Sequence, residues 1–353
     1  MRSHVGNVKV RGGILEYKSN NFGFLRLLLA TLVIISHSPE LLYPNHQREI
    51  LSSIFDTITF GELAVDSFFL ISGYLILQSF KNSTTLKSYF FKRCLRIYPA
   101  FVVVTLVCIF IVAPLSGGID VLARISALEW LNHIGRVVTL KQPLIDGVFV
   151  NNRTHYLNGS MWTIRYEFFC YLLIPFIFYL RFFNIKLIST LLLLLASLII
   201  ALIDFRISSF NLQVVRFCAL FFSGCFFYMF RDKIKWNLAL TIVSIIGLIF
   251  SLSYSIYVAH FGLMIFGAYL MFNFALNFKS SFISSIGTKN DISYGVYLYA
   301  WPVQNLIIQY YPSVEPYQVN IGTLLVVLPL AYLSYRFVER PFINMKSRFV
   351  FAK

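Results

Sequence analysis

The sequence predicts an all-α membrane protein, a bundle of about ten transmembrane helices. Of its 353 residues, 58% are hydrophobic and only 13% are charged, whereas a soluble domain carries about 25% charged residues. The mean hydropathy is +0.72, and apolar runs approaching the roughly 20 residues needed to cross a bilayer recur along the chain. These observations indicate a polytopic membrane protein without a sizeable soluble domain.

The first expected span, 22–38, follows a polar and basic segment. No small-residue cleavage site comes after it and further spans follow, so we expect an uncleaved span rather than a signal peptide. The remaining spans are expected at 62–80, 99–115, 163–181, 185–204, 212–230, 236–252, 255–276, 292–311 and 320–337. Only the short stretch Ser251–Ser255 separates 236–252 from 255–276.

The basic residues orient this bundle. An even number of spans places both termini on one side, and most of the 30 Lys and Arg residues fall in segments on that side. Because Lys and Arg accumulate in cytoplasmic segments, we expect both termini in the cytoplasm. The net charge of +15 is then a topological signal, and no nucleic-acid partner is expected. We expect one domain over 1–353, with its membrane bundle at 22–337 and a long extracytoplasmic segment at 116–161.

The first span carries an arginine, Arg26, and a histidine, His37. Eleven residues at about 100° each place both side chains on one helix face, about 16 Å apart along the axis. Ionisable groups inside a span are costly and mark functional sites. Taken singly, each residue is equally well explained by a structural role. Arg26 can extend its charged end to the lipid headgroups, and His37 can cap the outer end of the helix.

Two carboxylates are expected near His37. Asp66 lies about one turn below the outer surface on the second span, and Glu167 one to two turns below it on the fourth. Three titratable groups at similar depth suit general base catalysis, because imidazole titrates near working pH and a carboxylate can fix its tautomer. The alternative is that each carboxylate only hydrogen-bonds neighbouring helices.

A basic pair is expected at the opposite surface. Arg93 and Arg96 precede the third span and are three residues apart, so on a helix they are neighbours that can hold a phosphate with forked donors. Anchoring at the membrane boundary is the alternative, and Pro99 is expected to begin the helix. Nucleophile, Walker and HExxH motifs are absent, which favours direct transfer with His37 as base, although a covalent acyl-histidine stays open.

The chain resembles the acyltransferase-3 family of integral membrane O-acyltransferases. The motifs that carry the resemblance occur in the family's order: Arg26-x10-His37, GELAVDSFFLISGYL at 61–75, KRCLRIYPAF at 92–101, GSMWTIRYEFFCYL at 159–172, ISYGVYLYAWPVQ at 292–304 and VERPF at 338–342. The resemblance implies about ten spans and transfer of an acyl group from cytoplasmic acyl-CoA to a carbohydrate. It is strongest to stand-alone members, without an SGNH domain, that modify O-antigen, exopolysaccharide or Nod-factor sugars.

The resemblance also implies roles for individual residues. His37 matches the family's catalytic base, and Arg93 and Arg96 match a basic motif that we assign to the phosphates of CoA. From depth in the bundle rather than from the resemblance, we expect the thioester to pass Arg26 and either Asp66 or Glu167 to orient His37. One position departs from the family pattern, since Ala300 stands where many relatives carry a second histidine.

Acceptor recognition is expected in the segment 116–161. Its aromatic and polar side chains suit stacking on a sugar and hydrogen bonding to it: Trp130, Asn132, His133, Asn151, Asn152, His155, Tyr156 and Asn158. The apolar beginning of this segment, 119–134, is alternatively an interfacial helix.

Together these features predict an O-acetyltransferase of the bacterial cytoplasmic (inner) membrane. It is expected to use acetyl-CoA without a metal and to modify O-antigen, exopolysaccharide or a related glycan. Two alternatives stay open. One is a transporter or flippase for an anionic lipid or acyl metabolite, and the other is transfer of succinyl, with Arg165 as the cation near the end of the acyl group.

Overall fold

The predicted helical membrane bundle is confirmed. The computed structural model describes residues 8–11, 14–17, 20–45, 48–179, 209–288 and 290–350. Within them, seven segments are long and apolar enough to cross a membrane: Phe22–Leu42, Phe60–Lys81, Leu86–Gly117, Gly159–Phe178, Leu212–Phe230, Ile256–Asn277 and Pro316–Met345. An antiparallel hairpin of two short strands, β1 (Val8–Arg11) and β2 (Ile14–Tyr17), precedes the bundle and was not expected from the sequence.

The helices follow the chain in this order: α1 (Phe22–Leu42), α2 (Ile50–Phe55), α3 (Phe60–Lys81), α4 (Leu86–Val107), α5 (Ala113–Gly117), α6 (Ala127–Val138), α7 (Ile164–Tyr179), α9 (Ser209–Phe230), α10 (Leu238–Tyr254), α11 (Ile256–Gly262), α12 (Ala268–Asn277), α13 (Ser281–Ser285), α14 (Ser293–Tyr310), α15 (Pro316–Ser334) and α16 (Arg340–Val350). Short 3-10 helices lie at Ile119–Val121 and Gly159–Thr163. Single π-helical turns lie at Cys108–Val112, Leu263–Gly267 and Tyr335–Glu339.

The expected spans coincide with these helices, apart from 185–204, which lies outside the described residues. One boundary was wrong, because Pro99 lies inside α4 rather than at its start. Thr85 caps α4 by accepting a hydrogen bond from the Ser88 amide, so the helix begins 13 residues before the expected boundary. The basic segment that was placed before the membrane is therefore part of a helical span. The number of spans and the cytoplasmic side of the termini stay predictions.

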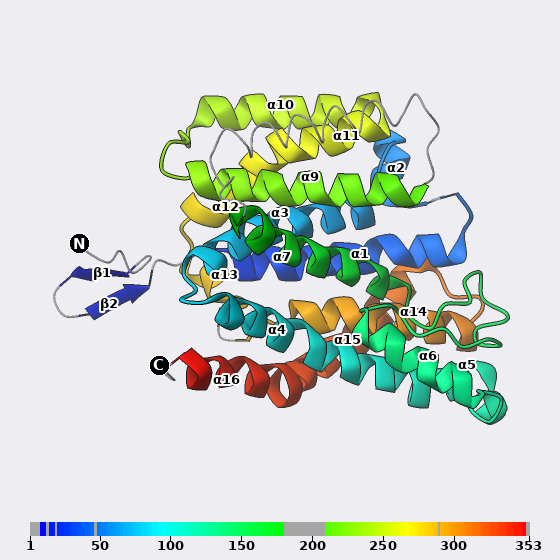
Figure 1. Cartoon of the computed structure of the whole chain (residues 1–353). Coiled ribbons are helices and arrows are strands. Elements are labelled where there is room, and N and C mark those ends of the chain that lie inside the picture. The colour runs from blue at the N-terminus through cyan, green and yellow to red at the C-terminus, as the bar shows by residue number, and fades with distance from the viewer. Residues whose placement is uncertain are drawn as a thin grey trace.

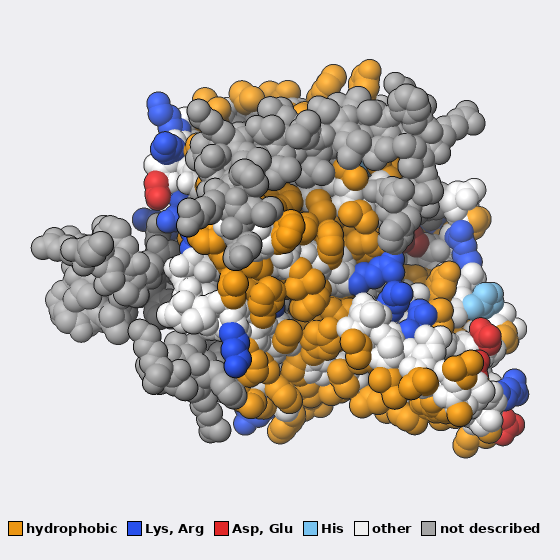
Figure 2. All heavy atoms as spheres, viewed as in Figure 1, with side chains coloured by type: hydrophobic (Ala, Val, Ile, Leu, Met, Phe, Trp, Pro, Cys, Tyr) orange, Lys and Arg blue, Asp and Glu red, His pale blue; other side chains and the backbone are white. Residues whose placement is uncertain are grey.

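The helices pack around α3, which lies between α1 and α9 (Figure 1). Beyond α9 lie α10 and α11, and on the other side of α1 lie α14 and α15, with α4 against α16. The first residues of α1 and all of α16 lie at the same end of the bundle (Figure 1). Hydrophobic side chains cover much of the visible face, as expected of a surface that meets lipid (Figure 2).

Glycines allow α3 and α9 to approach closely. A Cβ atom on Gly73 of α3 would lie 1.8 Å from the carbonyl oxygen of Phe221 on α9. A Cβ atom on Gly224 of α9 would lie 2.0 Å from the carbonyl oxygen of Leu70 on α3. Small residues at helix interfaces are typical of membrane bundles, in which association depends on close packing.

We therefore expect Gly73→Ala to destabilise the bundle, because the added methyl group can fit only if the two backbones move apart. Overpacking of this kind costs about 1–3 kcal/mol. The measurement is the thermal unfolding of detergent-purified protein, with Gly135→Ala as the control, since a Cβ on Gly135 in α6 meets no atom within 4 Å. Equal melting temperatures for the two variants would contradict the close packing of α3 and α9.

Candidate active site

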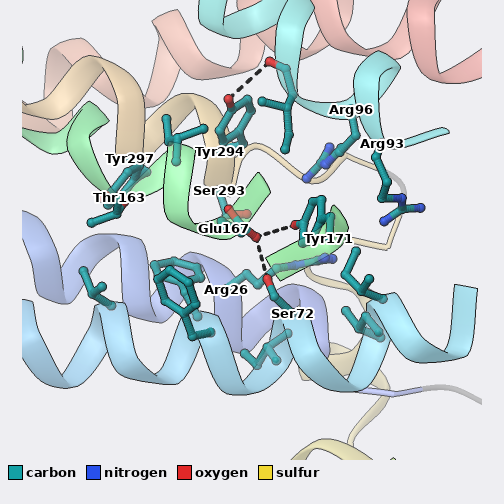
Figure 3. A pocket seen from close by; sticks show the side chains of 18 residues that line it. Arg26, Ser72, Arg93, Arg96, Thr163, Glu167, Tyr171, Ser293, Tyr294 and Tyr297 are labelled. Atoms are coloured by element: carbon teal, nitrogen blue, oxygen red, sulfur yellow. Dashed lines mark hydrogen bonds between the residues drawn. The ribbon is translucent and has the colours of Figure 1, made fainter. Parts of the chain in front are cut away.

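A cavity between α1, α3, α4, α7 and α14 collects most of the predicted site residues. Arg26 of α1, Arg93 and Arg96 of α4 and Glu167 of α7 all line it (Figure 3). The cavity has a volume of about 160 Å³. The other polar groups on its wall are hydroxyls, those of Ser72, Thr163, Tyr171, Ser293, Tyr294 and Tyr297. The two remaining predicted site residues, His37 on α1 and Asp66 on α3, do not line the cavity.

Two of the arginines share one carboxylate. The Oδ2 atom of Asp291, which lies just before α14, is 3.1 Å from Nη2 of Arg26 and 2.7 Å from Nη2 of Arg96. The other terminal nitrogen of Arg96, Nη1, is 3.2 Å from Oε2 of Glu339. Burial alone would raise the pKa of the Asp291 carboxyl, but the two guanidinium charges and hydrogen bonds from Ser293 lower it to about 2. Asp291 is therefore ionised and neutralises charge behind the cavity wall.

Arg93 is held differently. Its Nη2 atom donates a hydrogen bond of 3.1 Å to Oγ of Ser79, and its guanidinium carbon lies 5.9 Å from the ring centroids of both Tyr89 and Tyr171. Its Nε atom is buried without a hydrogen-bond partner among the described residues. Arg93 also forms no ion pair with the part of the chain that the structure describes. A buried guanidinium in this state has donors available for an anion.

Glu167 lies on the cavity wall as a hydrogen-bond acceptor. Its Oε1 atom is 2.5 Å from Oγ of Ser72 and 2.5 Å from the hydroxyl oxygen of Tyr171. Both hydroxyls donate, because an ionised carboxylate can only accept. Glu167 thus joins α7 to α3 beside the arginines.

The expectation that Glu167 lies at the depth of His37 was wrong. Gly61 of α3 faces Ser36 of α1, because a Cβ on Gly61 would lie 3.0 Å from the Ser36 hydroxyl oxygen. Ser72 is eleven residues farther along α3, or about 16 Å, and Glu167 binds it. The 3-10 helix before α7 rises about 2.0 Å per residue rather than 1.5 Å, which carries Glu167 deeper than an α-helix would.

Asp66 belongs to a separate buried ion cluster. Its Oδ1 atom is 2.7 Å from Nη2 of Arg216 on α9, and its Oδ2 atom is 2.6 Å from Nδ1 of His260 on α11. The Asp66 side chain is fully buried. It therefore joins three helices and does not orient His37. The signal that could have indicated this was the presence of Arg216 and His260 inside otherwise apolar spans.

His37 has a different carboxylate partner, Glu40. The Nδ1 atom of His37 lies 3.2 Å from Oε2 of Glu40, which is three residues later on the same helix face. The His37 ring meets Trp301 of α14 edge to face at 5.0 Å between centroids. The expectation that Asp66 or Glu167 orients His37 was wrong, because each is bonded elsewhere. The spacing of His37 and Glu40 was visible in the sequence and was overlooked.

One face of α14 connects the cavity with His37. Tyr297 lines the cavity, and its hydroxyl lies 2.7 Å from Oγ1 of Thr163. Trp301, which meets His37, is four residues later and so lies on the same face one turn on. The Thr163 and Tyr297 pair thus lies at the cavity end nearest to His37, away from Arg93 (Figure 3).

The segment 116–161 folds largely onto the bundle. Asn152 binds Asn305, and Asn158 donates to the carbonyl oxygen of Leu298, so both amides are buried structural groups. His133 is also buried, and Trp130 stacks on Phe110 and meets the His133 ring edge to face. The members of the expected acceptor-binding set that stay exposed are Asn132, Asn151, His155 and Tyr156. The alternative of an interfacial helix at 119–134 agrees in part with α6, which begins at Ala127. An apolar row is exposed on this helix at Leu128, Leu131, Ile134 and Val138.

Comparison with known proteins finds similarity to acyltransferases. The family Acyl_transf_3, described as an acyltransferase domain, matches residues 20–336. The chain is 29% identical over 353 residues to the O-acetyl transferase of Shigella phage Sf6, an alignment that covers 94% of this chain and 98% of that protein. It is 30% identical over 167 residues to nodulation protein 10 of Rhizobium leguminosarum bv. viciae, covering 44% of this chain and 43% of that protein. No solved structure matches.

The cluster around Asp66 leads to a stability prediction. Asp66→Asn removes the fully buried charge and leaves Arg216 with only the longer, partly exposed contact of 3.5 Å to Glu62, so we expect a cost near the lower end of the about 3–5 kcal/mol typical of a broken buried pair. Thermal unfolding in detergent should show a large fall in melting temperature, whereas Asp120→Asn in the exposed 3-10 turn should leave it unchanged. Full stability combined with lost activity would instead show that Asp66 acts in catalysis.

Proposed function

The chain belongs to the acyltransferase family Acyl_transf_3, and on this premise we propose that it transfers an acetyl group from cytoplasmic acetyl-CoA to a hydroxyl of a cell-surface or lipid-linked carbohydrate. The family and the O-acetyl transferase of the phage make it a membrane O-acyltransferase. The observation that carries the finer proposal is the cavity in which Arg26, Arg93 and Arg96 converge. We place the enzyme in the bacterial cytoplasmic membrane.

The charge of the cavity suits an anionic donor. Three guanidinium groups and one carboxylate line it, and two of those guanidinium groups are already paired with Asp291 and Glu339, so the positive charge offered to an incoming phosphate is centred on Arg93. Arg93 is the first contact that we propose for a phosphate of CoA, because no carboxylate pairs with it in the part of the chain that the structure describes. Arg26 and Arg96 add to the field, but Asp291 and Glu339 already share their donors. Arginine suits this task because its planar fork binds phosphate through two parallel hydrogen bonds.

The opposite end of the cavity suits the acyl group. Apolar side chains such as Phe68 and Ile164 line the cavity together with the Thr163 and Tyr297 hydroxyls. The thioester arm is uncharged, so it fits this wall, and its acyl end then points toward Trp301 and His37. Movement of the Thr163 and Tyr297 pair would open the way between the cavity and His37.

His37 is the general base in this proposal. It removes the proton from an acceptor hydroxyl, whose oxygen attacks the carbonyl carbon of the thioester. The C–S bond breaks, and the thiolate of CoA takes a proton from the imidazolium, so acetyl-CoA and the sugar become the acetyl ester and CoA. General base catalysis of this kind contributes about 10²–10⁴-fold to a rate. No step in this scheme requires a metal.

The other predicted catalytic residues take supporting roles. Asp66 joins helices through Arg216 and His260, and Glu167 fixes Ser72 and Tyr171 on the wall of the donor cavity. We propose that the carbohydrate approaches from the outer end. Exposed Asn132, Asn151, His155 and Tyr156 can there stack on a sugar or hydrogen-bond to it.

Neither alternative gains support from the structure. A transporter is disfavoured because the chain belongs to an enzyme family. Succinyl transfer needs a cation at the acyl end of the cavity, but Arg165 is not among the residues that line it, and its Nη2 atom donates to the hydroxyl oxygen of Tyr166. An acetyl group, which carries no charge, is the better match to a cavity end lined by hydroxyls and apolar groups.

His37→Ala should abolish transfer, because it removes the imidazole that takes the proton from the acceptor hydroxyl. The measurement is the incorporation of radiolabelled acetyl from acetyl-CoA into glycan by membranes that contain the variant, together with CoA release. We expect a loss of at least about 100-fold at unchanged protein level. The matched control is His4→Ala in the N-terminal segment, which should be fully active. Retained transfer by His37→Ala would remove His37 as the base.

Arg93→Ala tests the donor site separately. Loss of charge-assisted hydrogen bonds worth about 1.5–3 kcal/mol should raise the KM for acetyl-CoA about tenfold or more. Lys92→Ala is the matched control, because the Nζ atom of Lys92 bonds Oγ of Ser83 and the residue does not line the cavity. An equal KM in the two variants would place the donor phosphates elsewhere.

A further inference from the structure

We infer that Glu40 is the positioning residue of His37, a role that rests on the proposed function and completes its base. The carboxylate of Glu40 accepts a hydrogen bond from the protonated Nδ1 of His37. This leaves Nε2 as the basic nitrogen that faces the acceptor hydroxyl. It also stabilises the imidazolium that forms when His37 takes the proton. The two side chains then act as a dyad built within one turn of α1.

The distance supports this pairing. Oε2 of Glu40 lies 3.2 Å from Nδ1 of His37, and the two side chains are only about one fifth exposed, 18% and 21%. A neutral imidazole carries its proton on one nitrogen, and a carboxylate next to Nδ1 selects the tautomer with the proton there. Nε2 makes no hydrogen bond to the residues that the structure describes. It therefore remains available as a base.

Glu40 is itself held in place, as a positioning residue must be. Oγ of Ser36 donates a hydrogen bond of 2.9 Å to Oε1 of Glu40, so the two carboxylate oxygens have different partners. Nη1 of Arg153 donates to the main-chain oxygen of Glu40 at 3.2 Å. Ser36 is fully buried, so its hydroxyl has little freedom to move. One oxygen is thus fixed by the helix interior, and the other is directed at His37.

Neighbouring elements hold the ring and its helix. Trp301 of α14 lies edge to face against the His37 ring. The amide of Gln304, one turn later on α14, donates to the Ile34 carbonyl oxygen and to Oγ of Ser38, both at 2.8 Å. These bonds tie α1 to α14 on either side of His37. Rigid support of this kind keeps a base within the narrow geometry that proton transfer needs.

Among the described residues, the charged groups that we find around His37 come from two elements. Glu40 supplies a negative charge from α1 itself, and Arg153 approaches the main chain of Glu40 from the segment before the 3-10 helix. On the side of α14 the neighbour is Trp301, which does not titrate. Removal of the Glu40 charge therefore changes the electrostatic environment of His37 directly.

The test compares Glu40→Gln and Glu40→Asp with the wild type. The assay uses purified protein in detergent, radiolabelled acetyl-CoA, and a total glycolipid extract of the host membrane as acceptor. In Glu40→Gln the amide can donate to Nδ1 and favour the wrong tautomer, so kcat should fall at least about tenfold while the KM for acetyl-CoA stays within about twofold. Glu40→Asp keeps the charge and should retain more activity than Glu40→Gln.

Two further readouts separate positioning from a structural role. Half-maximal activity on the acid side should move to lower pH in Glu40→Gln, because the imidazolium loses its negative partner. Ser36→Ala should show the same kinetic pattern with a smaller fall in kcat, because Glu40 keeps its charge but loses one anchor. Glu129→Gln, the same chemical change on the exposed start of α6, is the matched control and should behave as wild type.

A wild-type kcat in Glu40→Gln would overturn the inference, as would a loss of activity that only follows a loss of folded protein. His37→Ala, assayed in parallel, distinguishes the two levels of the proposal. If His37→Ala is inactive and Glu40→Gln is fully active, the positioning role alone fails. If His37→Ala is active, the proposed base fails as well.

Discussion

The ion network of Arg26, Asp291, Arg96 and Glu339 is the constraint on which the rest of the site depends. It ties α1, α4, the start of α14 and the π-helical turn after α15 together at one end of the cavity. Charged groups inside a membrane bundle are costly, and pairing with carboxylates lowers that cost. Because the network occupies Arg26 and Arg96, the neighbouring Arg93 is left with buried donors and no carboxylate partner among the described residues.

The intramembrane polar groups divide into three sites with separate tasks. The arginine cavity is suited to bind an anionic donor, the pair of His37 and Glu40 is suited to remove a proton, and the cluster around Asp66 joins helices. Since Arg26 and His37 are about 16 Å apart along α1, the donor must extend through most of that length. The face of α14 that carries Tyr297 and Trp301 spans the interval between the two reactive sites.

Residue patterns predicted what depends on local chemistry and missed what depends on tertiary partners. The spans followed from apolar runs, and the neighbouring positions of Arg93 and Arg96 on one helix followed from their spacing of three residues. The 3-10 helix before α7 accounts for only about 2.5 Å of the extra depth of Glu167. The rest depends on its contact with Ser72 of α3, which spacing along the chain does not show. The two partners of Asp66, Arg216 and His260, were missed because they lie 150 and 194 residues away in the chain.

The most direct measurement is a structure of the protein in a lipid nanodisc with a non-hydrolysable acetyl-CoA analogue bound. Our account predicts phosphate density next to Arg93, the pantetheine arm between α3, α7 and α14, and the acetyl carbonyl within reach of His37. Density for the analogue outside this cavity, or an acetyl group directed away from His37, would contradict the account.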